Sequence, residues 1–332
     1  MLKLNHLFEN FELAKNCIQN YDHDPASLDE TLRWFRISSN AVYPFRQGGR
    51  LCFLRLCPAA EKSLRDVESE IAVIAWLRAQ GFAAMEPVPM KDGRLCGLFA
   101  TPWGDYVVSC FAQVAGQPLE NCPATPALIE GYGRCLGQLH TLLERCPHSE
   151  NRQDHRDLLE QAMQRLERYG APASIREAAQ QLMALLEQLP TSPACYGLVH
   201  YDFEPDNVFF HAPTGQFSVI DFDDMIRCWY GLDMVRALDG LSDVGGDTDT
   251  PCEPLDGDPA ALFLQGYRLV RPFSQAEEAA LPLMRRLVQL VEYANLLYVL
   301  DAEVPNPPEW MVHLRSVLEG KQRWLESQLN NR

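Results

Sequence analysis

A short stretch of the chain combines carboxylates and an asparagine with apolar runs. Asp202 precedes Asn207 by five residues, and Asp221 directly follows the apolar run 217–220. This run and the apolar piece 208–210 flank a turn that contains proline and glycine, a pattern that predicts a β-hairpin. Such a hairpin carries Asn207 and Asp221 to the same end and leaves Asp202 in the loop just before it.

Oxygen-bearing side chains at one end of a hairpin suit a hard cation. Mg²⁺ in proteins is usually held by one or two carboxylates together with waters and substrate phosphates. The remaining carboxylate, Asp202, can accept a hydrogen bond from a substrate hydroxyl and orient it in line with a phosphorus atom. The predicted chemistry is therefore phosphoryl transfer to an alcohol, although a solvated acidic turn beside an ordinary hairpin is the simpler alternative.

The segment His200 to Asp221 resembles the H-x-D-x-x-x-x-N loop and the downstream metal-binding aspartate of the aminoglycoside phosphotransferase and choline kinase family, within the protein-kinase-like fold. The resemblance implies that Asp202 is the catalytic base or hydroxyl-orienting residue and that Asn207 and Asp221 hold Mg²⁺, with ATP as the phosphoryl donor. It implies supporting roles for His200, within the loop, and for Asp233, which resembles the aspartate that braces the loop from the larger lobe.

The resemblance extends to the nucleotide side of the site. Ser39 and Asn40 lie in a segment similar to the family's nucleotide-covering hairpin, where backbone N–H groups can contact phosphates. Arg55 occupies the strand position at which the family usually has a phosphate-binding lysine, and Glu70 lies where the ion-pair partner of that lysine is expected. Arginine is a departure, because its planar fork has a different reach from an ammonium group.

Further positions are assigned by the same resemblance. Ala112 and Val114 precede Gly116 in the segment similar to the interlobe hinge, where backbone groups meet the adenine edge. Tyr201 fills a position where the family often has glycine, so a side chain must be accommodated in the loop. Asp223 is a second departure, and it is expected either to contact the metal site or to be a solvated turn carboxylate.

The elements that must position these residues follow from periodicity. Residues 35–43 and 51–56 are β-forming runs around a glycine-containing turn, residues 63–80 have helical spacing, and two extended stretches follow up to residue 114. Later segments are mostly helical, namely 125–143, 154–168, 175–189, 260–269, 275–301 and 309–329. The predicted fold is α+β and bilobal, with a small antiparallel sheet and one main helix in a nucleotide-binding lobe, 1–114, and a mainly α-helical catalytic and acceptor-binding lobe, 115–332.

Composition excludes several classes of partner. A formal charge of -16 argues against nucleic acid, because such proteins gain affinity from lysine and arginine placed against phosphates. No run approaches the roughly 18 apolar residues that a membrane-spanning helix needs, and the first 20 residues lack the apolar core of a secretory signal. Eleven cysteines without CxxC pairs indicate reduced thiols and a cytoplasmic protein.

The expected partner is a small-molecule hydroxyl acceptor, and its identity stays open. Seven acidic residues and no lysine or arginine lie between Asp239 and Asp258, which favours a cationic amino alcohol or amino sugar. A solvated acidic loop explains the same pattern equally well, and neutral or zwitterionic acceptors remain open. A catalytically weak nucleotide-binding regulatory protein is the alternative function, motivated by Arg55 and the non-glycine loop. A metal-dependent hydrolase is a third option, but it lacks closely spaced histidine ligands.

Overall fold

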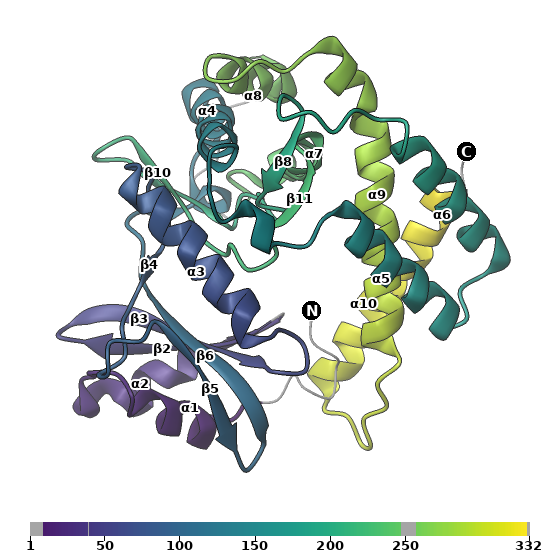
Figure 1. Ribbon diagram of the computed structural model, residues 1–332. Helices are drawn as coiled ribbons and strands as arrows, with labels where there is room; N and C mark the ends of the chain where they lie inside the picture. The colour runs from purple at the N-terminus through teal and green to yellow at the C-terminus, as the bar shows by residue number, and fades with distance from the viewer. Residues whose placement is uncertain (1–8, 39, 247–256, 331–332) are drawn as a thin grey trace.

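The computed structural model describes residues 9–38, 40–246 and 257–330. The molecule has an N-terminal lobe with an antiparallel sheet and a larger helical lobe (Figure 1), which confirms the predicted fold class. Ser39 lies outside the described residues. Within them, no helix combines the length and the apolar character that crossing a membrane requires, and the cysteines are free thiols.

The sheet of the N-terminal lobe has the strand order β1-β2-β3-β6-β4, with β5 also paired to β6, and its pairings are antiparallel. The strands are β1 (Arg36–Ile37), β2 (Ala41–Gln47), β3 (Arg50–Pro58), β4 (Glu86–Pro87), β5 (Cys96–Thr101) and β6 (Gly104–Ala112). The β2–β3 hairpin and the β5–β6 pair correspond to the four extended stretches predicted from the sequence.

Both faces of this sheet are covered by helices (Figure 1). Alternate residues of β6 point to opposite faces. Val107 and Phe111 belong to the apolar cluster that contains α3 (Leu64–Ala79). Val108 and Cys110 belong to the cluster of α1 (Phe11–Ile18) and α2 (Leu28–Thr31), two helices that were not predicted.

The larger lobe contains the hairpin that was predicted to carry the site. Strands β9 (Val208–His211) and β10 (Gln216–Val219) pair with Val208 opposite Val219, and β7 (Gln117–Pro118) extends this small sheet. Beside it, β8 (Tyr196–Val199) pairs with β11 (Ile226–Trp229). The catalytic loop of the prediction therefore runs from the end of β8 to the start of β9.

Helices form the rest of the larger lobe. They are α4 (Pro126–Leu143), α5 (His155–Arg168), α6 (Ala173–Leu186), α7 (Gly231–Asp239), α8 (Pro259–Arg268), α9 (Gln275–Leu300) and α10 (Glu309–Asn330). Helices α4 and α8 meet through glycines. A Cβ atom at Gly133 would overlap the Phe263 carbonyl oxygen, and one at Gly266 would overlap the Glu130 carbonyl oxygen.

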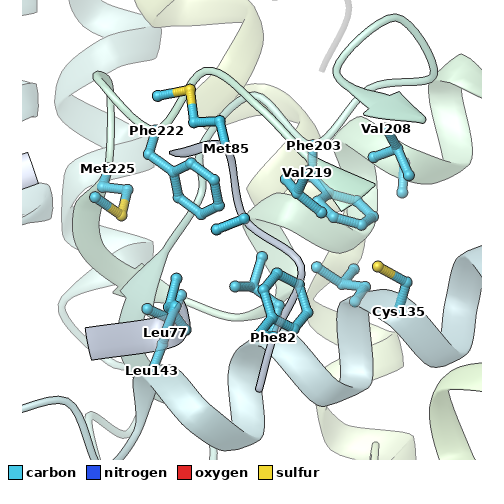
Figure 2. Close-up of a cluster of buried hydrophobic side chains, with 14 of the residues drawn as sticks. Leu77, Phe82, Met85, Cys135, Leu143, Phe203, Val208, Val219, Phe222 and Met225 are labelled. Atoms are coloured by element: carbon cyan, nitrogen blue, oxygen red, sulfur yellow. The ribbon is translucent and has the colours of Figure 1, made fainter. Parts of the chain in front are cut away.

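An apolar cluster joins the two lobes next to the hairpin (Figure 2). It contains Leu77 of α3, Phe82 and Met85 from the segment after α3, and Val219 and Phe222 at the end of the hairpin. The same segment is hydrogen-bonded to β10, because Met85 N–H donates to Val219 O at 3.0 Å and Val219 N–H to Ala83 O at 2.9 Å. These contacts fix the N-terminal lobe against the residues that carry Asp221.

Candidate active site

Asp233 of α7 holds the loop that contains Asp202. Its Oδ2 accepts from His200 N–H and its Oδ1 from Tyr201 N–H, each at 2.7 Å. Asp233 is fully buried, and His140 Nε2 lies 3.0 Å from Oδ2. The geometry agrees with the bracing role that the sequence resemblance implied for this aspartate.

The residue before the expected catalytic aspartate and the expected metal-binding aspartate itself have left-handed backbone angles. Tyr201 has φ 75° and Asp221 has φ 62°, a conformation that is uncommon for residues other than glycine. The Tyr201 side chain is accommodated against Arg236, whose Cζ lies 5.3 Å from the ring centroid. His200 Nε2 lies 2.9 Å from Ile220 O, so the loop is also joined to the residue before Asp221.

Asp202, Asn207 and Asp221 line one cleft, which has a volume of about 570 Å³ and lies between the lobes. Asn207 Nδ2 donates to the backbone oxygen and to Oδ2 of Asp202, both at 3.0 Å. Because its amide nitrogen is engaged, Asn207 can offer Oδ1 to a cation. The structure thus brings together the three residues that the sequence placed at the reacting centre.

The electrostatics of these carboxylates fit a divalent cation. Burial, with the adjacent charge of Asp223, raises the pKa of Asp221 well above its ordinary value, and Arg55 only partly opposes this. Bound cations reverse such shifts, because they stabilise the charged carboxylate. Burial also raises the pKa of Asp202, while the charge of Arg236 acts in the opposite direction.

Arg55 and Glu70 form a buried bidentate ion pair. The Arg55 guanidinium donates to Glu70 Oε1 at 2.9 Å and to Oε2 at 2.5 Å, and its Nε donates to Ser109 Oγ at 3.2 Å. Its Cζ also lies 4.8 Å from the centroid of the Phe111 ring. Arg55 lines the cleft, whereas Glu70 lies behind it and orients the guanidinium.

The other predicted nucleotide residues that the structure describes also lie in the cleft. Asn40, Ala112 and Val114 are part of its lining. Apolar side chains complete the wall on this side, namely Trp34, Val42, Phe53, Met85, Phe209 and Ile220. An apolar wall beside backbone groups of residues 112–114 is suited to a flat aromatic base.

Sequence reasoning missed the environment of Asp223. This carboxylate is 5% exposed, so its interpretation as a solvated turn residue is wrong. It accepts from Asn40 Nδ2 at 2.7 Å and forms an ion pair with Lys62 at 2.6 Å. Lys62 was not predicted as a site residue, because a lysine before a helix cap is usually solvated.

The acidic segment is only partly described. Asp239 forms an ion pair with Arg285 at 2.6 Å, and Asp258 caps α8 by accepting from Ala260 N–H. The acidic residues at 247, 249, 253 and 256 lie outside the described residues.

The fold is that of a protein-kinase-like phosphotransferase. Residues 36–279 match the phosphotransferase enzyme family, and the chain belongs to that family. It is a small-molecule kinase, and ATP and a divalent cation, both expected from the sequence, agree with this membership.

Similar proteins cover most of the chain. Amicoumacin kinase of Bacillus subtilis (strain 168) is 23% identical over 310 residues, covering 90% of this chain and 88% of that protein. A homoserine kinase of Azorhizobium caulinodans is 28% identical over 271 residues, covering 75% and 77%.

Solved structures show the same fold. The amicoumacin kinase hAmiN in complex with AMP-PNP, Ca²⁺ and Ami has a TM-score of 0.75 at 20% identity, covering 97% of this chain and 94% of that chain. A microcompartment-associated aminopropanol kinase has a TM-score of 0.65 at 22% identity, covering 97% and 99%.

Proposed function

We propose that the protein transfers the γ-phosphate of ATP to a hydroxyl group of a small molecule that carries an amine. The observation that supports phosphoryl transfer is that Asp202, Asn207 and Asp221 line one cleft between the lobes. In this proposal residues 1–114 form the nucleotide-binding lobe and residues 115–332 the catalytic and acceptor-binding lobe.

Each residue of the cleft has a role in the proposal. Asn207 and Asp221 hold Mg²⁺, which offsets the charge of the β- and γ-phosphates when bound. Arg55 keeps N–H groups for phosphate after pairing with Glu70, because a guanidinium has five donors. Backbone N–H groups of the nucleotide-covering segment with Ser39 and Asn40 contact the phosphates, and Ala112 and Val114 contact adenine.

Asp202 performs the proton transfer. The hydroxyl proton of the acceptor passes to an Asp202 carboxylate oxygen, and the hydroxyl oxygen forms a bond to the γ-phosphorus. The bond between this phosphorus and the bridging oxygen breaks, and ADP leaves. Because burial raises the pKa of Asp202 above its ordinary value, the carboxylate is a stronger base than an exposed aspartate.

A second cavity supports the choice of an amine. It has a volume of about 240 Å³, and its wall includes Tyr201, Asp223 and Asp224. Several cationic side chains in this wall are engaged by the protein. The Arg152 guanidinium donates to three backbone oxygens, and Lys62 pairs with both aspartates. The Asp224 side chain is 41% exposed and contacts Lys62 through Oδ1, so its second carboxylate oxygen, Oδ2, is the atom proposed to attract a cation.

A zwitterionic hydroxy amino acid is the second candidate. Arg165 lines the same cavity, and its guanidinium contacts Asn295 Oδ1 and the ring of Tyr298. An arginine in this place can bind the carboxylate of a hydroxy amino acid in bidentate fashion. An acceptor without a carboxylate would not make this contact.

A labelled-ATP screen tests the proposed function. Amino alcohols, amino sugars, hydroxy amino acids and neutral sugars are offered to wild type, Asp202→Asn and the control Asp92→Asn, an exposed turn residue. Label should reach an amine-bearing acceptor, and Asp202→Asn should lower kcat by about 10²- to 10⁴-fold, the usual contribution of acid–base catalysis. An Asp202→Asn variant as active as wild type would contradict the assignment of the base.

The same screen separates the acceptor classes. Asp224→Asn should raise KM for amine-bearing acceptors more than for neutral sugars. If only hydroxy amino acids are labelled, the second candidate is correct, and if nucleotide binds while no acceptor is labelled, the proposed acceptor class is wrong.

A further inference from the structure

Lys62 lies in the connection between β3 and α3, yet its side chain reaches the other lobe. Its Nζ lies 2.6 Å from Asp223 Oδ2 and 2.7 Å from Asp224 Oδ1, and the side chain is 21% exposed. A cation placed between two carboxylates at these distances is charge-paired on the side that faces the larger lobe.

Asp223 connects this lysine to the nucleotide-covering segment. The Oδ2 atom that pairs with Lys62 also accepts from Asn40 Nδ2 at 2.7 Å. The backbone oxygen of Asp223 accepts from Arg152 at 2.7 Å. Asp223 is therefore held by two residues of the N-terminal lobe and one of the larger lobe.

The charge balance at Asp223 agrees with this arrangement. Burying a carboxylate without partners is costly, and Asp223 is 5% exposed, so the contacts of its Oδ2 atom with Lys62 and Asn40 offset that cost. This paired Asp223 stands two residues after Asp221.

We propose that Lys62 is a positioning residue that joins the nucleotide-covering segment of one lobe to the metal-binding segment of the other. It acts through Asp223, and it keeps the Asp223 carboxylate turned toward the N-terminal lobe and away from the cation held by Asn207 and Asp221. The assignment rests on the proposed function, since it uses the same nucleotide and metal site. Nothing in it requires Lys62 to touch the transferred phosphate.

Two cationic side chains, one buried and one partly exposed, have separate roles in this arrangement. Arg55 is oriented by Glu70 and faces the nucleotide cleft, whereas Lys62 lines the neighbouring cavity together with both aspartates. Without Lys62, the Asp223 side chain should become less well fixed, and with it the Asn40 side chain that is hydrogen-bonded to it. The expected defect therefore concerns the binding of Mg-ATP and not the proton transfer at Asp202.

The test compares Lys62→Met, Lys62→Arg and the control Lys15→Met, which removes an exposed lysine that pairs with Asp29 at 2.5 Å in the same lobe. Binding of Mg-ATP is measured by calorimetry at several Mg²⁺ concentrations, and KM and kcat follow from the acceptor that the screen identifies. Lys62→Met should weaken Mg-ATP binding by at least about tenfold, as for other losses of one partner from a buried charge pair. It should shift the Mg²⁺ dependence and raise KM much more than it lowers kcat.

The variants also separate positioning from stability. Lys62→Arg should recover most of the affinity, because it restores a cation at the same place. The double variant Lys62→Met/Asp223→Asn removes both charges and should regain thermal stability while Mg-ATP binding stays weak.

Wild-type affinity and Mg²⁺ dependence in a folded Lys62→Met variant would overturn the proposal, as would full affinity in the double variant. The binding measurement needs no acceptor. A wild-type protein that binds Mg-ATP but phosphorylates nothing would refute the proposed function while leaving the role of Lys62 open to the same measurement.

Discussion

Glu204 lies two residues after Asp202 and contributes a carboxylate that the proposed reaction does not use. Arg236 donates to Glu204 Oε1 at 2.9 Å and to Glu292 Oε1 at 2.7 Å. Burial raises the pKa of Glu204 to about 7, with Asp202, Asp206 and Glu292 acting in the same direction and Arg236 opposing them. Glu204 therefore titrates close to neutral pH beside the reacting centre.

This shift predicts a pH dependence of stability. The folded-state pKa of about 7 lies above the ordinary value of 4.5, so the native state binds the proton more tightly than the unfolded state. The stabilisation from Glu204 is complete below pH 4.5 and is lost as the pH rises through 7. The side chain is 36% exposed, so solvent screening reduces the effect to about 1 kcal/mol.

Glu204→Gln should remove this dependence. Urea unfolding at about pH 5 and about pH 8 should show that wild type loses about 1 kcal/mol more than Glu204→Gln over this interval. Exposed Glu187 at the C-terminal end of α6 is the control position, and Glu187→Gln should behave as wild type. Parallel pH profiles for wild type and Glu204→Gln would exclude the shifted carboxyl group.

The site residues that could be predicted from the sequence are those that lie close to one another along the chain. Asp202, Asn207 and Asp221 could be placed from a five-residue spacing and one hairpin, both of which are local geometry. Lys62 could not be found in this way, because its partners lie more than 160 residues later in the chain. Only the packing of one lobe against the other makes it a residue of the site.

At the scale of elements, the close crossing of α4 and α8 depends on glycines. Each helix places a glycine where the other helix presents a backbone carbonyl, Gly133 against Phe263 and Gly266 against Glu130. The close approach brings Tyr132 of α4 against Phe203 in the catalytic loop, with ring centroids 5.1 Å apart and a hydrogen bond of 2.8 Å from the tyrosine hydroxyl to Phe203 O. Helix packing on the far side thus supports the loop.

Gly266→Ala should destabilise the protein, because a methyl group must displace the backbone of the partner helix. The expected loss is about 1–3 kcal/mol, as for other overpacked cores. Gly320→Ala in α10 is the matched control, since a Cβ atom there meets nothing within 4 Å. This control should gain about 0.5–1 kcal/mol from the better helix propensity of alanine. Equal effects of the two substitutions in denaturant unfolding would contradict the packing argument.

The predicted helices and strands were those with long periodic patterns. Residues 63–80 and 275–301 were predicted as helices, and the structure has helices at 64–79 and 275–300. Helices α1 and α2 escaped prediction because they are short, eight and four residues, and are stabilised by burial against the sheet. Such tertiary stabilisation leaves little periodic signal in a short segment.

At the scale of the whole molecule, the cleft proposed as the nucleotide site is lined by both lobes. Arg55 and Asn40 come from the N-terminal lobe, whereas Asp202, Asn207 and Asp221 come from the larger one. The bilobal fold was predictable from the change from strands to helices along the sequence. The predicted boundary at residue 114 falls between β6 and β7 and stays a prediction.

Mg-ATP should stabilise the folded chain as a unit. A ligand at 100 times its Kd adds about 2.7 kcal/mol to the free energy of unfolding, so the thermal midpoint should rise when ATP and Mg²⁺ are present together. Asp221→Asn should lose the part of this rise that depends on Mg²⁺, whereas Asp92→Asn should keep it. Thermal unfolding with ATP alone, Mg²⁺ alone and both together measures the difference. An unchanged Mg²⁺-dependent rise in Asp221→Asn would refute its role as a ligand.

One more contact crosses between the two lobes, at the cavity proposed for the acceptor. The Tyr298 hydroxyl of α9 donates to Glu61 Oε1 at 2.5 Å, across 237 positions of sequence. Spectroscopic labels attached near these two positions would report the distance between the two lobes in solution. Their separation could be followed during turnover without altering any residue that meets the nucleotide.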